Sequence, residues 1–219
     1  MARERSATVS GGEKLVLLHG IARTKFSMWG IARHLKPSGY EVLNLGYPSR
    51  HFRLEQLVEY IHPRIREFAA GAPVHFVVHS MGGLLVRAYL TRYPETKIGR
   101  VVMLGTPNHG SEVADYMKDW RLYRWIFGPA GQQLVTHQQG ISQLFGPVNF
   151  PLGIIAGNTT IDVFCSRIIG QTNDGKVSVE STKLQGMEAH IVLPVSHLGM
   201  LYSRSVRAHI VRFLKTGAF

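Results

Sequence analysis

One serine in the sequence stands where a nucleophile would be expected. Ser80 lies in the segment HSMGG at 79–83, directly after the apolar run 74–78 and before a helical pattern over 81–92. A serine on a sharp strand-to-helix turn projects its hydroxyl above the edge of a sheet, and the start of the helix stabilises negative charge beside it. The segment therefore predicts a nucleophilic Ser80. The alternative is an ordinary serine that caps a helix.

A serine nucleophile needs a histidine base and a carboxylate that orients this base. Of eleven histidines, His197 is the one that follows the carboxyl end of the apolar run 190–195, where sites on open parallel sheets gather. The chain has only four aspartates, and Asp174 lies in the turn formed by Asn173, Asp174 and Gly175. We expect His197 as the base and Asp174 as the acid. Asp162 and Glu180 are the alternative acids.

The run 14–18 leads into His19, Gly20 and Ile21. An enzyme with a serine nucleophile on such a turn binds the oxyanion with two backbone N–H groups. One belongs to the residue after the nucleophile, and the other belongs to a loop after an early strand. The backbone N–H groups of Ile21 and Met81 are therefore the predicted oxyanion donors. We expect His19 to hydrogen-bond nearby backbone rather than to transfer protons. A simple turn at the end of the strand is the alternative.

These residues need a scaffold of strands and helices. Short apolar runs are typical of buried parallel strands, and they occur at 14–18, 41–45, 74–78, 100–104, 152–156 and 190–195. Helical patterns lie between them, the longest over 54–68, where Pro63 should kink or split the helix. This alternation predicts an α/β fold with about six strands, mostly parallel, and with helices on both faces.

Residues 105–151 separate two predicted strands by more than an ordinary crossover, and 111–150 form a cap-like insertion rich in aromatic residues. Trp120 and Trp125 of this insertion, together with Met28 and Trp29 after the oxyanion loop, are candidate substrate-lining residues. The alternatives are a small core of the insertion itself and ordinary helix packing. Three bases, Lys118, Arg121 and Arg124, lie among the aromatics, and this mixture suits peripheral contact with an anionic membrane surface.

Four segments resemble the alpha/beta-hydrolase superfamily, and more narrowly its bacterial lipase and esterase branch. They are HGI at 19–21, HSMGG at 79–83, GTPNHGS at 105–111 and NDGKVS at 173–178. The resemblance runs from about residue 14 to 215, and it implies a serine, then an acid, then a histidine along the chain, with Asp174 as the acid. Val78 departs from the pattern, because the family usually has glycine there.

The resemblance implies two-step cleavage of a small carboxylic ester or lipid through an acyl-enzyme, without a metal ion or an organic cofactor. One alternative is an acyltransferase or thioesterase that uses the same three residues. Another, from a different class, is a non-catalytic binding protein on a hydrolase scaffold. An intact set of Ser80, Asp174 and His197 argues against that reading, because binding alone does not need all three.

The composition limits the remaining classes. The 219 residues carry a net charge of +11, but the bases are scattered singly or in pairs, and no nucleic-acid recognition motif is present. Cys165 is the only cysteine, which excludes an intramolecular disulfide and a zinc site built from thiolates. We expect one domain over 14–219 with a flexible arm at 1–13. No segment is typical of a signal peptide, so the expected location is cytoplasmic.

Overall fold

Six parallel strands form a single sheet in the computed structural model, which describes residues 12–136 and 143–219. The strands are β1 (Glu13–Leu18), β2 (Tyr40–Leu45), β3 (Val74–His79), β4 (Ile98–Leu104), β5 (Leu152–Gly157) and β6 (Ala189–Leu193). Their order is β2-β1-β3-β4-β5-β6, and all five pairings are parallel. The predicted α/β fold is confirmed, and each apolar run lies within a residue or two of its strand.

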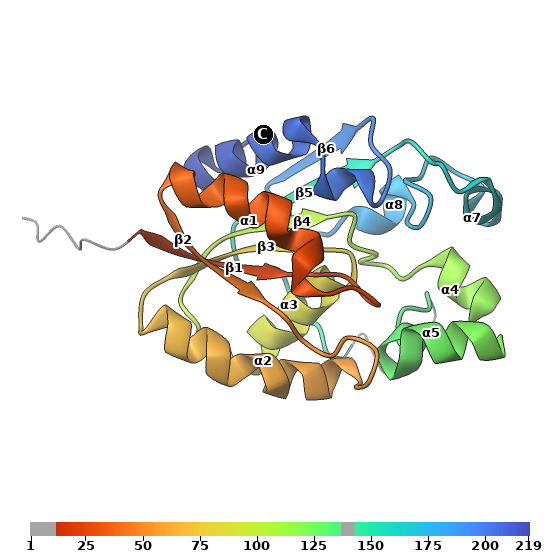
Figure 1. Ribbon diagram of the computed structural model, residues 1–219, viewed down its shortest axis with the longest axis horizontal. Coiled ribbons are helices and arrows are strands. Elements are labelled where there is room, and N and C mark those ends of the chain that lie inside the picture. Colours follow the sequence, from red (N-terminus) through yellow and green to blue (C-terminus); the bar gives the residue numbers. More distant parts are fainter. Residues whose placement is uncertain (1–11, 137–142) are drawn as a thin grey trace, which may run out of the picture.

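Helices cover both faces of the sheet (Figure 1). Helices α1 (Trp29–Leu35) and α9 (Arg204–Thr216) lie on one face, and α2 (Leu54–Ala69) and α3 (Met81–Arg92) lie on the other. Because side chains alternate along a strand, β1 contributes to two separate cores. Val16 and Leu18 join the cluster under α2 and α3, whereas Leu15 and Leu17 join the cluster under α1 and α9.

Helix α2 departs from its prediction at Pro63. The helix runs without a break from Leu54 to Ala69, so the expected split does not occur. Pro63 lies on the exposed side of α2, while Ile61 and Ile65 on either side of it are buried. The proline removes one intrahelical hydrogen bond, the one to the Glu59 carbonyl, on the exposed side of the helix, and the buried apolar stripe holds the helix together.

Several short helices gather beyond the carboxyl ends of the strands (Figure 1). They are α4 (Glu112–Met117), α5 (Arg121–Gln132), α7 (Val163–Ile169) and α8 (Val179–Thr182). Two 3-10 turns, η1 (Lys25–Met28) before α1 and η3 (Gly199–Leu201) before α9, lie nearer the core. A third such turn, η2 (Lys36–Ser38), precedes β2. The predicted insertion supplies α4 and α5. Its residues 137–142, like residues 1–11 of the predicted arm, lie outside the described residues, and β1 already includes Glu13.

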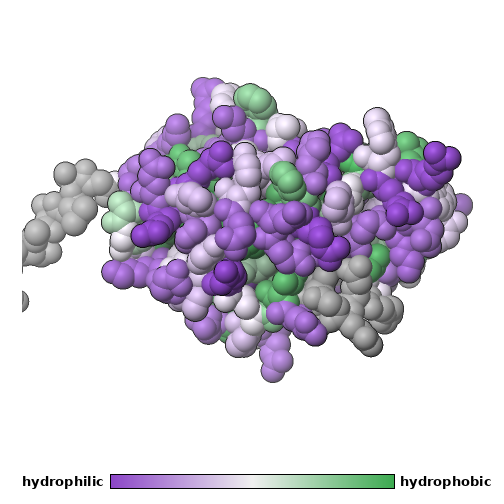
Figure 2. All heavy atoms as spheres, turned by 90° about the horizontal axis from the view of Figure 1, so that it is seen from below, coloured by the Kyte–Doolittle hydropathy of each residue, from purple (hydrophilic) through white to green (hydrophobic). Residues whose placement is uncertain are grey.

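The face that carries α2 is mostly hydrophilic, with apolar residues in small separate patches (Figure 2). In the described ranges no helix combines the length and apolarity needed to cross a membrane.

Candidate active site

Ser80 sits on a strained turn between β3 and α3. Its backbone has φ 54° and ψ −127°, a region that residues with a side chain rarely adopt. The turn is held from both sides, because Ser80 N–H donates to the Leu104 carbonyl at 2.9 Å and the Ser80 carbonyl accepts from Gly83 N–H at 2.9 Å. The predicted strand-to-helix turn is therefore present, and Ser80 is 8% exposed.

The two glycines after the turn allow α3 to approach the sheet closely. A Cβ atom on Gly82 would lie 2.7 Å from the Leu18 carbonyl oxygen, and one on Gly83 would lie 2.1 Å from Thr106 Oγ1. Real Cβ atoms do not tolerate such contacts, so both positions require glycine. Val78, where the resembled family usually has glycine, is accommodated as a fully buried member of the core between β1 and β4.

Asp174 and His197 form a buried pair near the carboxyl edge of the sheet. His197 Nδ1 lies 2.7 Å from Asp174 Oδ2, and the His197 backbone N–H donates to the Asp174 carbonyl at 2.8 Å. Asp174 is 2% exposed and His197 is 8% exposed. The two residues are thus joined through both side chain and backbone, as a charge-assisted pair shielded from water.

The turn around Asp174 fixes its carboxylate. Asn173 Oδ1 accepts from Gly175 N–H at 2.8 Å and closes the turn, in which Gly175 has φ 95°. Asp174 Oδ1 accepts two backbone N–H groups, those of Lys176 and Val177, each at 2.9 Å. One carboxylate oxygen therefore faces backbone donors while the other faces His197.

Asp162, the alternative acid, makes different contacts. Its Oδ1 caps the start of α7 by accepting from Cys165 N–H at 3.0 Å, and its Oδ2 lies 2.7 Å from Lys176 Nζ. The hydrogen bond from Lys176 lowers the pKa of Asp162 to about 2. Glu180, the other alternative, pairs with Lys183 at 2.7 Å. The described contacts of neither carboxylate include His197.

Two glycines behind the Asp–His pair carry no signal in the sequence for this role. A Cβ atom on Gly105, at the end of β4, would lie 2.9 Å from Asp174 Oδ2 and 3.1 Å from His197 Nδ1. One on Gly157, at the end of β5, would lie 2.9 Å from Asp174 Cβ. Gly105 begins the GTPNHGS segment, so the resemblance marks the position, but only the sheet order reveals what it touches.

His79 braces the loop that carries His197. Its Nε2 lies 2.9 Å from the His197 carbonyl oxygen, and the two rings are 4.7 Å apart between centroids. Burial lowers the pKa of His79 to about 3, so the ring is neutral near pH 7 and donates from Nε2. Its Nδ1 is buried and has no partner among the described residues.

The predicted oxyanion loop is rigidly held beside Ser80. The ring of His19 stacks on Tyr47 with a centroid distance of 4.1 Å, and the Tyr47 hydroxyl donates to the His19 carbonyl. His19 Nδ1 lies 2.9 Å from the Gly20 carbonyl oxygen, so this ring shapes the loop as expected. A Cβ atom on Gly20 would lie 3.1 Å from Ser80 Cβ, which places the turn into Ile21 directly against the serine.

Within the described residues, no protein acceptor is recorded for the N–H groups of Ile21 or Met81, and no hydrogen bond joins Ser80 Oγ to His197. The structure thus brings Ser80, Met81 and Ile21 to one place, and Asp174 and His197 to each other.

The four candidate substrate-lining residues have different surroundings. Met28 is fully buried in the core between α1, α9 and the sheet, so it packs a helix and is not available to a ligand at the surface. Trp29 is 56% exposed beneath the Arg33 guanidinium, and Trp120 and Trp125 are 43% and 72% exposed on the insertion.

Gln133 fastens the insertion to the core. Its Oε1 accepts from Leu54 N–H, at the start of α2, at 2.8 Å, and its Nε2 donates to Glu55 Oε2 at 3.0 Å. Gln133 is 2% exposed. Within the insertion, Tyr123 is also buried and its ring lies 4.7 Å from that of Phe127, and both residues pack into the main core under α2 and α3 rather than into a core of the insertion itself.

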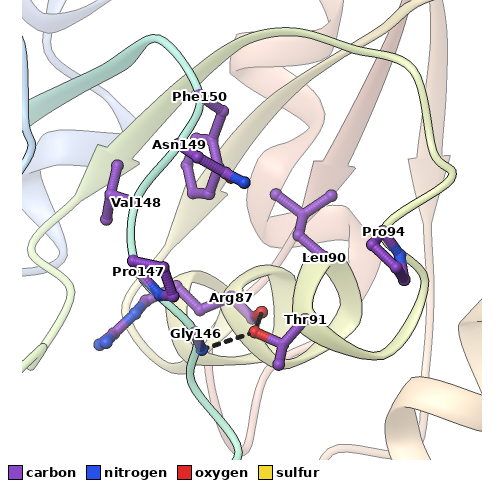
Figure 3. Close-up of a pocket in the computed structure, with 9 residues that line it drawn as sticks. All are labelled: Arg87, Leu90, Thr91, Pro94, Gly146, Pro147, Val148, Asn149 and Phe150. Atoms are coloured by element: carbon purple, nitrogen blue, oxygen red, sulfur yellow. Dashed lines mark hydrogen bonds between the residues drawn. The ribbon is translucent and has the colours of Figure 1, made fainter.

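A cavity of about 190 Å³ lies between α3 and the segment that leads into β5 (Figure 3). Its lining includes Arg87, Thr91 and Gly146, whose N–H donates to Thr91 Oγ1 at 2.8 Å. Arg87 Nη1 donates to Asn108 Oδ1 at 3.2 Å and so ties α3 to the GTPNHGS segment. Burial lowers the pKa of Arg87 to about 10. None of the three predicted catalytic residues lines this cavity.

In residues 12–136 and 143–219, no three His, Cys, Asp or Glu side chains are grouped closely enough to hold a metal ion.

The fold and this site define an α/β protein whose candidate functional side chains gather at the carboxyl edge of a parallel sheet. The chain belongs to the alpha/beta hydrolase fold family, whose model matches residues 14–138, more than half of its length. Among curated proteins, the chain is 33% identical over 117 residues to a triacylglycerol lipase of Pseudarthrobacter phenanthrenivorans, covering 48% of this chain and 36% of the lipase. It is 28% identical over 103 residues to the probable esterase PIR7A of Oryza sativa subsp. indica, covering 43% and 39%.

Solved structures with the same fold cover nearly the whole chain. The mature lipase BlEst2 of Bacillus licheniformis superimposes with a TM-score of 0.73 at 19% identity, covering 96% of this chain and 94% of the lipase. The phospholipase PlaB of Legionella pneumophila gives a TM-score of 0.78 at 17% identity, covering 93% and 60%. At these identities the likeness establishes the fold, and the chain spans only about a third of the length of its curated lipase relative.

Proposed function

We propose that this chain is a serine hydrolase that cleaves carboxylic esters through an acyl-enzyme on Ser80. The observation that carries the proposal is the Asp174–His197 pair, 2.7 Å apart and buried, at the same sheet edge as a serine on a strained turn. A structural role for these residues explains neither the strain nor the burial of an ionisable pair. The named activities of the relatives, triacylglycerol lipase and probable esterase, support ester chemistry.

In the first step, Ser80 Oγ attacks the ester carbonyl carbon and His197 Nε2 takes its proton. Asp174 Oδ2 accepts from His197 Nδ1, which fixes the tautomer that leaves Nε2 free to act as the base, and it stabilises the imidazolium that forms. The carbonyl oxygen becomes an oxyanion, for which we assign the Met81 and Ile21 N–H groups as donors. Such a donor contributes about 3 kcal/mol to the transition state.

In the second step, the His197 imidazolium protonates the leaving alcohol, and the acyl group stays on Ser80. A water molecule then attacks the acyl carbonyl and gives a proton to His197. His197 returns this proton to Ser80 Oγ as the bond between Ser80 Oγ and the acyl carbon breaks and the carboxylic acid leaves. All proton transfers pass through one imidazole, so the buried contacts that hold His197 in place are central to the proposal.

The test is labelling with a fluorophosphonate probe, which phosphonylates an activated serine. We expect the native protein to be labelled at Ser80, as located by peptide mass spectrometry, and Ser80→Ala to remain unlabelled. Heat-unfolded protein should also remain unlabelled, which separates an activated serine from a merely accessible one. Folded native protein that takes no label would refute the proposal.

A chain-length series of nitrophenyl esters then identifies the substrate class. Turnover that rises with acyl chains of about ten carbons or more, at an interface, indicates a lipase, and turnover restricted to short soluble esters indicates an esterase.

A further inference from the structure

Large apolar side chains are exposed at one end of the molecule, on and beside α4, α5 and α7. Six of them are between 43% and 84% exposed, and we refer to them as the apolar end: Tyr116, Trp120, Trp125, Ile161, Val163 and Phe164. Exposed apolar side chains that are scattered singly are ordinary on a protein surface, but a contiguous group indicates contact with another phase or partner.

Three rings of the apolar end, those of Tyr116, Trp120 and Phe164, lie against one another and are firmly supported. The Tyr116 ring lies 5.7 Å from that of Trp120 and 6.2 Å from that of Phe164, so α4 and α7 present one aromatic group. Beneath it, α4 and α7 pack through the buried side chains Val113, Cys165 and Ile169. The rings of Tyr116 and Phe164 are therefore exposed although the helices that carry them are well packed. Their exposure is not a result of loose packing.

Helix α5 is held by contacts of its Trp125 with Arg50. Arg50 Nη2 donates to the Trp125 carbonyl at 3.0 Å, and its guanidinium lies 5.6 Å from the Trp125 ring.

Helices α4, α5 and α7, which carry or adjoin the apolar end, lie beyond the carboxyl ends of the strands, and so does the segment between α7 and α8, to which Asp174 belongs (Figure 1). Lys176 connects the two, because its backbone N–H donates to Asp174 while its Nζ lies 2.7 Å from Asp162, which caps α7. The Lys176 carbonyl also accepts from Ser111 Oγ at 3.2 Å, and Ser111 caps α4.

The charge around the apolar end is positive. Lys118, Arg121, Arg124 and Arg167 are exposed there, and none of them forms an ion pair with an acidic residue in the described part of the chain. Between Lys118 and Arg124 in the sequence, the exposed acidic residue is Asp119. Tryptophan and tyrosine favour the headgroup layer of a membrane, where their rings are half solvated, and lysine and arginine near them attract anionic lipids.

We propose that the apolar end docks on the surface of an anionic lipid bilayer, with its rings in the headgroup layer and the four bases against the lipid phosphates. Ile161 and Val163 favour this partner over a nucleic acid, because aliphatic groups gain from hydrocarbon and have no partner on a base or a phosphate. The docking does not depend on the proposed ester chemistry, since it is a property of the surface alone.

Co-sedimentation with vesicles tests the charge requirement. The carrier is Ser80→Ala, so that lipid cleavage cannot alter the vesicles, and the vesicles are phosphatidylcholine with or without 30% phosphatidylglycerol, a composition of about one anionic lipid in three. We expect binding to the anionic vesicles only, and loss of that binding in high salt. Arg121→Glu with Arg124→Glu should weaken it by at least about 25-fold, since each base contributes about fivefold near such a surface.

The matched control changes the same number of charges elsewhere. Arg64→Glu with Arg66→Glu reverses two exposed arginines of α2, on the mostly hydrophilic face of Figure 2, and should weaken binding by less than about threefold through net charge alone. If both pairs weaken binding equally, the attraction is non-specific and the proposal fails. Thermal unfolding of each variant checks that the fold is intact.

Tryptophan fluorescence tests insertion of the rings. Trp29→Phe leaves Trp120 and Trp125 as the two emitters, and their emission should shift to the blue and be quenched by brominated lipid on vesicle addition. Absence of any shift, with vesicles that sediment the protein, would overturn docking through this end. The face would instead belong to a second copy of this chain if the protein self-associates with rising concentration, does not bind vesicles, and loses self-association in Trp120→Ser with Trp125→Ser. Tighter binding to an oligonucleotide than to vesicles would also overturn the proposal.

Discussion

Asp174→Asn should inactivate the protein without unfolding it, because of how the carboxylate is held. Asp174 Oδ1 accepts two backbone N–H groups, from Lys176 and Val177, and Oδ2 accepts from His197 Nδ1. An asparagine must keep its oxygen toward the two backbone N–H groups, because its NH₂ group is a donor and cannot accept hydrogen bonds from them. The NH₂ group then faces His197 Nδ1, which has to become an acceptor.

This reversal moves the His197 proton from Nδ1 to Nε2. A protonated Nε2 cannot take the proton of Ser80, so the base is present but in the wrong tautomer. The equivalent substitution in a serine protease lowers kcat by about 10⁴. A loss of this size corresponds to about 5.4 kcal/mol of activation free energy, at about 1.36 kcal/mol for each factor of ten.

Stability should change little, since the asparagine oxygen retains both backbone hydrogen bonds of the turn. Asp174→Ala, in contrast, leaves the N–H groups of Lys176 and Val177 without their acceptor, at a cost of about 1–3 kcal/mol for a buried group. Comparing the two variants separates the loss of the tautomer from the loss of the turn. Thermal unfolding should therefore resolve Asp174→Ala from the native protein, but not Asp174→Asn.

The assay is kcat/KM for a short nitrophenyl ester near pH 8, with Ser80→Ala as the background. Asp162→Asn is the matched control, because Asp162 also pairs with a base, Lys176 at 2.7 Å, but is partly exposed and does not contact His197. We expect less than a twofold change for this control. If Asp162→Asn abolishes turnover while Asp174→Asn retains more than a tenth of it, the reasoning about the acid is refuted.

Three further substitutions test the surroundings of the site. Gly105→Ala places a Cβ 2.9 Å from Asp174 Oδ2 at φ 54°, and the displaced pair should lower kcat/KM by about 10² in the same assay; turnover within threefold of native would contradict this. His79 has a folded pKa of about 3, below its ordinary 6.5, so the unfolded chain binds one more proton between these values and stability falls as pH drops through this window, by up to about 1.4 kcal/mol per pH unit. Urea unfolding from pH 7 to pH 4 should show a shallower fall for His79→Gln, and an unchanged slope would refute the assignment. Gln133→Ala leaves Leu54 N–H without its acceptor and should cost about 1–3 kcal/mol of unfolding free energy in urea, and a change below about 0.5 kcal/mol would contradict this role of Gln133.

The strands were predictable because buried parallel strands are short and apolar along their whole length. The run 14–18 differs from β1 by one residue, and 152–156 differs from β5 by one. The same clarity does not extend to Pro63, because sequence alone does not reveal that its ring lies on the solvent side of a helix whose other side is fully buried.

The site was predictable only in part. The segments around Ser80 and Asp174 are local turns, so their residue types carry the signal, and the small number of aspartates narrows the choice further. The contact of Gly105 with Asp174 and His197 arises because β4, β5 and β6 are neighbours in register. The bond from Leu54 to Gln133 joins residues 79 apart in the chain. Such contacts follow from the packing of whole elements, and no short segment encodes them.

The backbone of Ser80 has a consequence for how this chain would change if the proposed ester chemistry were not needed. Its φ of 54° with ψ −127° costs a residue with a side chain about 1–3 kcal/mol, whereas glycine adopts the same conformation freely. Glycine at position 80 would therefore give a more stable but silent protein. A drifting sequence would meet that substitution as an improvement in stability, so the serine at this turn supports the proposal that position 80 serves through its hydroxyl rather than through the fold.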